Sequence, residues 1–262
     1  MHTRAEKLEA FGRLLDIMDE LREKCPWDKK QTFESLRHLT IEETHELADA
    51  IIDADIQEIK KETGDVLLHM VFYAKLGSEI PEGEGGWDIA DSLNSICEKL
   101  ISRHPHIYGD VEANDEATVK ANWEKIKLKE GNNSVLEGVP RSLPSLIKAY
   151  RIQDKVRGVG FDWDNVSQVL DKVNEELEEL AVEVNAKSDR ISDEFGDVLF
   201  ALINYARFLD VNPDEALERT NRRFINRFMH LENAVKADNK DLGEMPLVEM
   251  EAYWNQAKKD LG

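Results

Sequence analysis

The segment EELEELAVEVNAKSDRISDEFGD, residues 175–197, nearly repeats an earlier one, EETHELADAIIDADIQEIKKETGD, residues 42–65. Both segments begin with the pattern Glu-Glu-x-x-Glu and end with Glu-x-Gly-Asp. Self-similarity over a long stretch of chain is the sequence signature of a repeated structural unit. We therefore expect two similar domains, each with its own cluster of acids.

The repeat extends beyond the acids and keeps its order. The equivalent pairs are Trp27 with Trp163, Lys99 with Arg223, Arg103 with Arg227, and Trp123 with Trp254. Between the copies, the stretch GNNSVLEGVPRSLP (131–144) is rich in Gly, Asn, Ser and Pro and has no period, which is typical of a linker. The predicted organisation is an N-terminal domain at 1–130, a linker at 131–145 and a C-terminal domain at 146–262.

Within each copy the apolar residues recur at spacings of three and four, which predicts an all-α fold made of two tandem helical bundles. The segments 66–76 and 198–209 are apolar on all sides, so we expect central helices that are covered on every side. A partner subunit would complete that cover, and we expect a homodimer. Both segments are shorter than the roughly 20 residues that a bilayer requires.

The charge of the chain excludes several classes of partner. Its formal net charge is −20, which repels the phosphate backbone of nucleic acids and the surface of anionic membranes. We expect neither a polymeric nucleic acid nor a membrane as a partner. The two cysteines form no disulfide framework and the N-terminal residues have no apolar signal core, so the expected location is the cytoplasm.

The acids lie on the apolar side of their helices. Glu43 and Glu46 precede Leu47 and Ala50 by one turn, and Glu176 shares a face with Val173. A solvated helix face is the ordinary explanation for many glutamates, but it does not explain why these point inward. Because buried like charges are costly unless a cation compensates them, the pattern favours a bound metal.

The donor types indicate which metal. Oxygen ligands without His or Cys suit Mg²⁺, with Mn²⁺ as a second possibility. A di-iron bundle would need Glu-x-x-His, whereas His69 follows Glu62 by seven residues. Gly64 and Gly196 each precede an Asp of the pattern, and we expect another group to approach the backbone closely there.

The acid pattern, with CPWD at 25–28, RHPH at 103–106 and GFDW at 160–163, resembles the full-length, two-domain MazG family of all-α nucleoside triphosphate pyrophosphohydrolases. The resemblance covers nearly the whole chain. It implies Mg²⁺-dependent hydrolysis of a nucleoside triphosphate between the α and β phosphates, usually by a dimer. It also implies broad acceptance of ribo- and deoxyribonucleotides, including altered ones, in cleaning the nucleotide pool.

The same resemblance implies specific ligands. In the family pattern the second Glu of Glu-Glu, the third Glu, and both acids of Glu-x-x-Asp hold the metal. The implied ligands in the second copy are Glu176, Glu179, Glu194 and Asp197, and those in the first copy are Glu43, Glu46, Glu62 and Asp65. Glu175 remains beside the ligands of the second copy and is our candidate for the general base.

The second copy is expected to hold the main catalytic site. Lys172 and Arg190 each precede a ligand by one turn, whereas Leu39 and Glu58 stand at those positions in the first copy. Asn204 stands at the position that the apolar Phe72 has in the first copy. A contact to substrate would explain this polar residue, and a core amide with its hydrogen bonds satisfied would explain it equally well. The candidate substrate-binding residues are Lys172, Arg190, Asn204, Arg223, Arg227, Trp254 and Phe161.

Two other functions stay open at this point. A helical module that binds nucleotides or a partner without turnover would share the fold and the acids. A structural scaffold explains the repeat but not the inward acids. Mixing the protein with ATP and Mg²⁺ separates the first alternative from an enzyme, since only an enzyme yields AMP and pyrophosphate.

Overall fold

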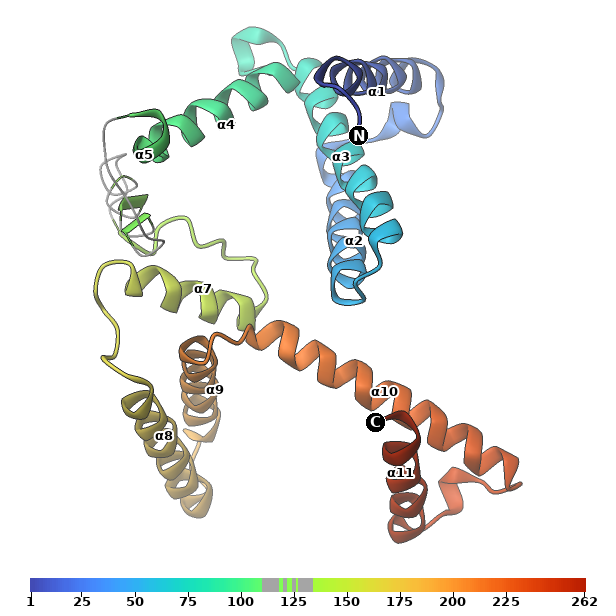
Figure 1. The fold of residues 1–262 in the computed structure, drawn as a ribbon, viewed down its shortest axis with the longest axis vertical. Helices are drawn as coiled ribbons and strands as arrows, with labels where there is room; N and C mark the ends of the chain where they lie inside the picture. Colours follow the sequence, from blue (N-terminus) through green and yellow to red (C-terminus); the bar gives the residue numbers. More distant parts are fainter. Residues whose placement is uncertain (110–117, 120–121, 124–125, 127–133) are drawn as a thin grey trace. The chain divides into compact units, whose positions relative to one another are not determined.

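The computed structural model describes residues 1–109, 118–119, 122–123, 126 and 134–262. All regular elements of these residues are helices, so the predicted all-α fold is confirmed (Figure 1). The chain divides into two compact units, Met1–Asp115 and Glu116–Gly262. The predicted boundary at 130 and the first three residues of the predicted linker, 131–133, lie outside the described residues.

The first unit is built around a pair of helices that lie side by side. Its elements are α1 (Arg4–Lys24), η1 (Asp28–Lys30), α2 (Phe33–Ile52), α3 (Ile56–Ser78), η2 (Glu82–Glu84), α4 (Ile89–Arg103) and α5 (Pro105–Tyr108). Helices α2 and α3 pack along each other, and α1 packs on α3. Asp55, in the short turn between α2 and α3, accepts hydrogen bonds from the first backbone N–H groups of α3. This turn sets the two helices antiparallel.

The core of the first unit lies between these three helices. The buried apolar side chains of this core are Met18, Leu36, Val71, Phe72 and Leu76. Partly buried residues of α1 and α2, among them Phe11 and Leu39, pack around this core. The apolar spacing of three and four in the sequence thus becomes one contiguous core.

Arg22 ties the segment after α1 to the end of α3. Its guanidinium donates to both carboxylate oxygens of Glu79, at 2.7 and 2.8 Å. It also donates to the backbone carbonyls of Asp28 and of Gln31, the latter at 3.1 Å. Since Arg22 is largely enclosed and Glu79 follows α3 directly, this contact fixes the Cys25–Asp28 turn against the first bundle.

The second unit repeats the helix pair and adds a second hairpin. Its elements are α7 (Ser145–Arg157), α8 (Val166–Ala186), α9 (Ile191–Phe208), α10 (Pro213–Ala237), η3 (Leu242–Glu244) and α11 (Leu247–Leu261). Helices α8 and α9 pack along each other, α7 packs on α9, and α10 packs on α11. Asn165 caps α8 and Pro213 stands in the first turn of α10.

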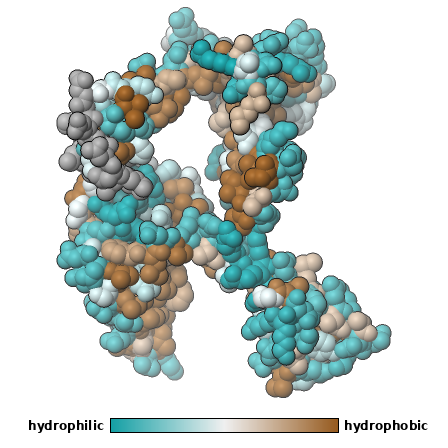
Figure 2. All heavy atoms as spheres, in the orientation of Figure 1, coloured by the Kyte–Doolittle hydropathy of each residue, from teal (hydrophilic) through white to brown (hydrophobic). Residues whose placement is uncertain are grey.

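The central helices are not covered on all sides by the chain. In α9, Val198 and Ile203 are buried, whereas Leu199 and Leu202 are 47% and 44% exposed. Figure 2 shows hydrophobic residues at the surface of the α8–α9 pair. One chain therefore leaves part of α9 uncovered, and the cover expected from a partner subunit stays a prediction. None of the helices in the described part of the chain has the length and apolarity needed to cross a membrane.

The glycines next to the acids do not mark a close contact inside the chain. A Cβ built at Gly64 or at Gly196 would meet no atom of another element within 4 Å. Packing of a second helix therefore does not explain these glycines in the described part of the chain, and the expected close approach of another group stays a prediction. The helix face at each glycine is instead open, beside Asp65 in α3 and Asp197 in α9.

Replacing Leu36 with Ala is expected to lower the free energy of unfolding by about 2–5 kcal/mol, because Leu36 is 1% exposed and its loss leaves a cavity. Urea denaturation followed by circular dichroism measures the change. Leu8→Ala, at a site that is 60% exposed, is the control and should change the stability by less than about 0.5 kcal/mol. Equal effects of the two substitutions would place the core elsewhere.

Candidate functional site

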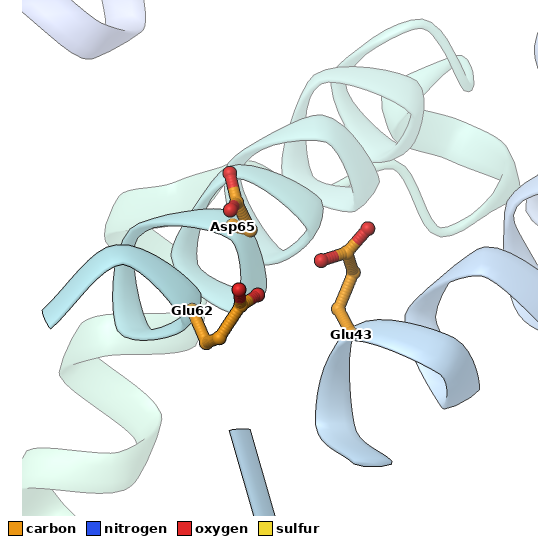
Figure 3. A group of neighbouring side chains, drawn as sticks. All are labelled: Glu43, Glu62 and Asp65. Atoms are coloured by element: carbon orange, nitrogen blue, oxygen red, sulfur yellow. The ribbon is translucent and has the colours of Figure 1, made fainter. Parts of the chain in front are cut away.

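The first acidic cluster joins α2 and α3. Glu43 of α2 faces Glu62 and Asp65 of α3, and one carboxylate oxygen from each lies within 4.8 Å of those of the other two (Figure 3). The spacing of three places Glu62 and Asp65 on one face of α3, and the antiparallel packing brings Glu43 opposite them. The sequence pattern thus produces a convergent set of oxygen donors.

Glu62 is the most enclosed member of this cluster. The residue is 1% exposed, and its Oε1 accepts a hydrogen bond of 2.8 Å from Lys61 Nζ. Its Oε2 is buried and has no hydrogen-bond partner among the residues that the structure describes. A buried carboxylate oxygen without a partner is costly, and a hard divalent cation is a ligand that such an all-oxygen set accepts. The residues present therefore fit a metal.

Electrostatic repulsion inside the first cluster is visible at Glu43. Burial raises the pKa of its carboxyl above the ordinary value, and the nearby charges of Asp65, Glu46 and Glu62 raise it further. The opposite effect holds at Lys61, whose pKa is raised by hydrogen bonds to Glu58 and Glu62. The cluster thus favours any added positive charge.

The second acidic cluster has the same construction in α8 and α9. Oxygens of Glu176, Glu194 and Asp197 all lie within 4.8 Å of one another. Glu176 and Glu194 are buried, while Asp197 is exposed. Burial raises the pKa of Glu194, Arg190 lowers it, and the charges of Glu179 and Asp197 raise it again.

The fourth expected ligand of each copy lies outside these groups of three. Glu46 and Glu179 are exposed, one turn after Glu43 and Glu176 on the same helices. Both are near enough to contribute to the raised pKa of a cluster member, Glu43 in the first copy and Glu194 in the second. The structure therefore brings three of the four expected ligands together and leaves the fourth at the solvent edge.

Cations lie against both clusters. In the second copy Lys172 Nζ is 2.8 Å from Glu176 and 3.0 Å from Glu175, and Arg190 pairs with Glu194. In the first copy Lys61 fills this role, 2.8 Å from Glu62.

Lys61 was missed by the comparison of equivalent positions. Glu58 and Lys61 of the first copy stand where the second copy has Arg190 and Asp193, so the charges are exchanged within one helix turn. The signal was a lysine directly before Glu62. The first cluster therefore keeps a cation, at a different position from that of the second.

The proposed general base lies beside the second cluster. Glu175 is 56% exposed at its side chain and contacts Lys172. It shares that cation with Glu176, so the two neighbouring carboxylates face the same ammonium group.

Two arginines expected to bind substrate have other partners in this structure. Arg223 donates to Thr220 Oγ1 at 2.9 Å, and Arg227 donates to the carbonyl of Gly262 at 2.8 Å. Both belong to α10, and among the described residues their hydrogen bonds go to these groups rather than to the acids.

The aromatic candidates differ in their surroundings. Trp254 of α11 packs against the core of Leu231, Val235 and Met245, and its ring centroid is 5.0 Å from that of Phe224. Trp254 is thus part of the hydrophobic core of the α10–α11 hairpin. Phe161, in the loop between α7 and α8, is 79% exposed and available to a ligand.

Asn204 is half-buried and has a defined hydrogen-bond partner. Its side-chain oxygen accepts from Arg207 Nε at 3.1 Å and from Arg207 Nη2 at 2.8 Å. Sequence reasoning did not single out Arg207, because a basic residue near the end of an apolar helix is an ordinary feature.

A polar network under the first cluster was also missed. Thr40 Oγ1 lies 2.9 Å from His69 Nδ1 and 2.6 Å from the hydroxyl of Tyr73. Burial lowers the pKa of His69, although Asp65 opposes that effect. The second copy has Val173 and Ala201 in place of Thr40 and His69, so the two helix pairs differ in polarity behind their acids.

Comparison with known proteins agrees with this geometry. The family model described as the MazG nucleotide pyrophosphohydrolase domain matches residues 31–108 and 165–231, which contain both acidic clusters. The chain belongs to the MazG family. MazG relatives include a protein of Escherichia coli strain K12 named nucleoside triphosphate pyrophosphohydrolase, which is 40% identical over 262 residues, covering 96% of this chain and 98% of that protein.

Two further relatives show how far the MazG similarity extends. A Thermotoga maritima protein named nucleoside triphosphate pyrophosphohydrolase/pyrophosphatase MazG is 40% identical over 254 residues, covering 95% of each chain. The YabN protein of Bacillus subtilis is 43% identical over 261 residues, covering 95% of this chain and 52% of YabN.

Neutralising Glu43 of this MazG chain is expected to stabilise the protein in EDTA. A carboxyl with a pKa raised by folding adds stability only below its unfolded pKa, and that stability is lost as the pH rises through the folded pKa. At pH 7 the ionised Glu43 therefore opposes folding, and Glu43→Gln should raise the melting temperature in calorimetry. The gain should vanish near pH 4 as the native carboxyl becomes protonated, about its ordinary pKa.

Glu34→Gln in the same helix is the control with the opposite sign. Hydrogen bonds from its own backbone N–H and from Thr32 lower the pKa of Glu34, so its charge favours folding at pH 7. The melting temperature of this variant should not rise. An equal rise in both variants would mean that any loss of negative charge stabilises the chain.

Proposed function

We propose that this protein is a nucleoside triphosphate pyrophosphohydrolase that cleaves the bond between the α and β phosphates, giving a nucleoside monophosphate and pyrophosphate. The observation that carries the proposal is the convergence of three carboxylates within 4.8 Å in each copy, one of them buried with an unpartnered oxygen in the first copy. The printed names of the relatives from E. coli and T. maritima support the reaction type.

The proposed cofactor is Mg²⁺, with Mn²⁺ as an alternative, because every donor is a carboxylate oxygen. The proposed ligands are Glu176, Glu179, Glu194 and Asp197 in the second site and Glu43, Glu46, Glu62 and Asp65 in the first. When bound, the metal supplies positive charge to the triphosphate and lowers the pKa of the attacking water.

The chain's own groups complete the reaction. Lys172 and Arg190 lie against Glu176 and Glu194 and would offer their donors to phosphate oxygens once a triphosphate is present. Glu175, beside the proposed ligands, would take the proton of the attacking water. The open helix face at Gly196 leaves room for the phosphates next to Asp197.

Other candidate residues extend the proposed substrate site. Arg223 and Arg227 would contact phosphates, and Trp254 and Phe161 would stack on the base. We propose a broad range of ribo- and deoxyribonucleoside triphosphates as substrates, including altered ones, with the second unit as the main site. The proposed setting is the cytoplasm, which suits the free thiols of Cys25 and Cys97.

The variant Glu176→Gln with Glu179→Gln is expected to reduce pyrophosphate release from ATP and Mg²⁺ by at least about a hundredfold, since several kcal/mol of charge stabilisation are lost. Chromatography of AMP and a pyrophosphate assay measure the reaction. The matched pair Glu43→Gln with Glu46→Gln should have a smaller effect. Full activity of the first variant would refute the assignment of the second site.

Absence of AMP in the unaltered protein would refute the enzyme and favour a binding module without turnover. A nucleotide panel run with the same two variants then assigns each substrate to a unit. Release of inorganic phosphate instead of pyrophosphate would indicate cleavage at a different bond.

A homodimer is part of the proposal, with a second copy of the chain covering the exposed apolar face of α9. Leu199 and Leu202 are about half exposed, and contiguous apolar surface of this kind is typical of an interface. Sedimentation equilibrium should give twice the mass of one chain. Leu199→Lys, which places a charge on that face, should shift the mass toward one chain, and a single-chain mass for the unaltered protein would refute the dimer.

A further inference from the structure

Arg207 is a buried cation that the proposed reaction does not use. Its side chain is 5% exposed near the C-terminal end of α9, and its guanidinium forms a two-pronged pair with Asp162. Nη1 donates to Asp162 Oδ2 at 2.8 Å, and Nη2 donates to Oδ1. Nε, at 3.1 Å, and Nη2, at 2.8 Å, donate to the side-chain oxygen of Asn204. One guanidinium therefore connects a loop 45 residues earlier with a half-buried amide.

This contact fixes which way the amide of Asn204 points. A guanidinium has only donors, so the amide oxygen has to face Arg207. The NH₂ group of Asn204 is then turned away from Arg207 and offers donors only. Asp162 holds Arg207 in turn, and also accepts the backbone N–H of Trp163 at 3.0 Å, so the orientation is set by a chain of three residues.

The position of Asp162, Arg207 and Asn204 in the fold points to the nucleoside end of a bound nucleotide. Asn204 follows Asp197 by seven residues, which is two turns on the same face of α9, or about 10 Å along its axis. The loop that carries Asp162 also carries Phe161, a ring that is 79% exposed. The acids mark the triphosphate end, and the amide and the ring lie beyond it.

The first copy has no counterpart of this arrangement at the equivalent positions. Phe72 and Lys75 stand where the second copy has Asn204 and Arg207, and Lys75 pairs instead with Asp19 of α1 at 2.7 Å. The corresponding turn in the first copy is held by Arg22 through backbone carbonyls. An arginine thus anchors the turn in both copies, and in the described residues the arginine of the second copy also orients an amide.

We propose that Arg207 is a positioning residue that, held by Asp162, orients Asn204 so that its NH₂ group donates to an acceptor atom of the nucleoside. The inference rests on the proposed function, because it assigns a part of the same substrate site. It assigns recognition of the sugar or base to this chain of residues, and leaves cleavage to the acids. Loss of Arg207 should therefore weaken substrate binding much more than turnover.

The test uses full-length protein carrying Glu43→Gln and Glu46→Gln, so that turnover reports the second site. In this parent chain, Arg207→Met and Asn204→Ala are each expected to raise KM for ATP about tenfold, the effect of one lost hydrogen bond, with kcat changed less than about threefold. Arg207→Lys keeps the positive charge but loses the two-pronged guanidinium. Its KM for ATP should therefore lie between that of the parent and that of Arg207→Met.

The double variant of Asn204→Ala and Arg207→Met separates positioning from independent contact. If Arg207 acts through Asn204, KM rises about tenfold in the double variant, rather than the roughly hundredfold that independent effects would give. Parent-like KM in both arginine variants, or a multiplicative increase in the double variant, overturns the proposal. If Arg207→Met does not fold, Arg207→Lys alone decides, and an unchanged KM overturns it.

Two measurements keep this result distinct from the proposed function. Calorimetric binding of α,β-methylene-ATP with Mg²⁺ should show the same loss of affinity in each variant, and it reports on the orientation of Asn204 even if the parent chain releases no pyrophosphate. Arg22→Met unties the corresponding turn of the first unit and serves as the matched control, with KM and Kd expected to stay within twofold of the parent. A parent chain that neither hydrolyses nor binds the nucleotide overturns both proposals.

Discussion

Three carboxylates whose oxygens lie within 4.8 Å of one another repel, and the rest of each unit depends on how that repulsion is offset. The antiparallel helix pair holds the acids together, and burial of Glu62 and Glu194 makes their charge more costly still. A neighbouring cation lowers that cost in each copy. The clustered acids therefore lower the stability of the folded state at one place in each unit. Such a cost is typical of a binding site.

The two copies meet the same requirement with different residues. Lys61 compensates Glu62 in the first copy, whereas Lys172 and Arg190 compensate the second. Because an ammonium or guanidinium on a long side chain reaches the same carboxylate from either of two positions one turn apart, the cation can exchange places with an acid and the cluster is preserved. Equivalent sequence positions are therefore a poor guide to equivalent charge.

The second unit combines these acids with a distinct polar arrangement two turns further along α9. Lys172 and Arg190 lie at the acidic end, and Asn204, Arg207 and Phe161 at the other. An extended nucleotide has the same polarity, with charge at one end and a neutral ring at the other. In the proposed function the acids of the second unit handle the phosphates and the polar arrangement beyond them handles the nucleoside, and the first unit lacks that arrangement at the equivalent positions.

The sequence by itself determined the helices, the duplication, the inward direction of Glu62, Glu176 and Glu194, and the pairing of Glu62 with Asp65 and of Glu194 with Asp197. The duplication follows from the repeated pattern of residues, and the rest follows from the 3.6-residue period, which fixes geometry within one helix. Only the tertiary structure decided that Glu43 and Glu176 join the groups of three while Glu46 and Glu179 stay at the edge. It alone brought Asp162 to Arg207, and left α9 partly uncovered. Such contacts depend on how separate helices cross and which rotamers fit between them, and a period along the chain does not encode that.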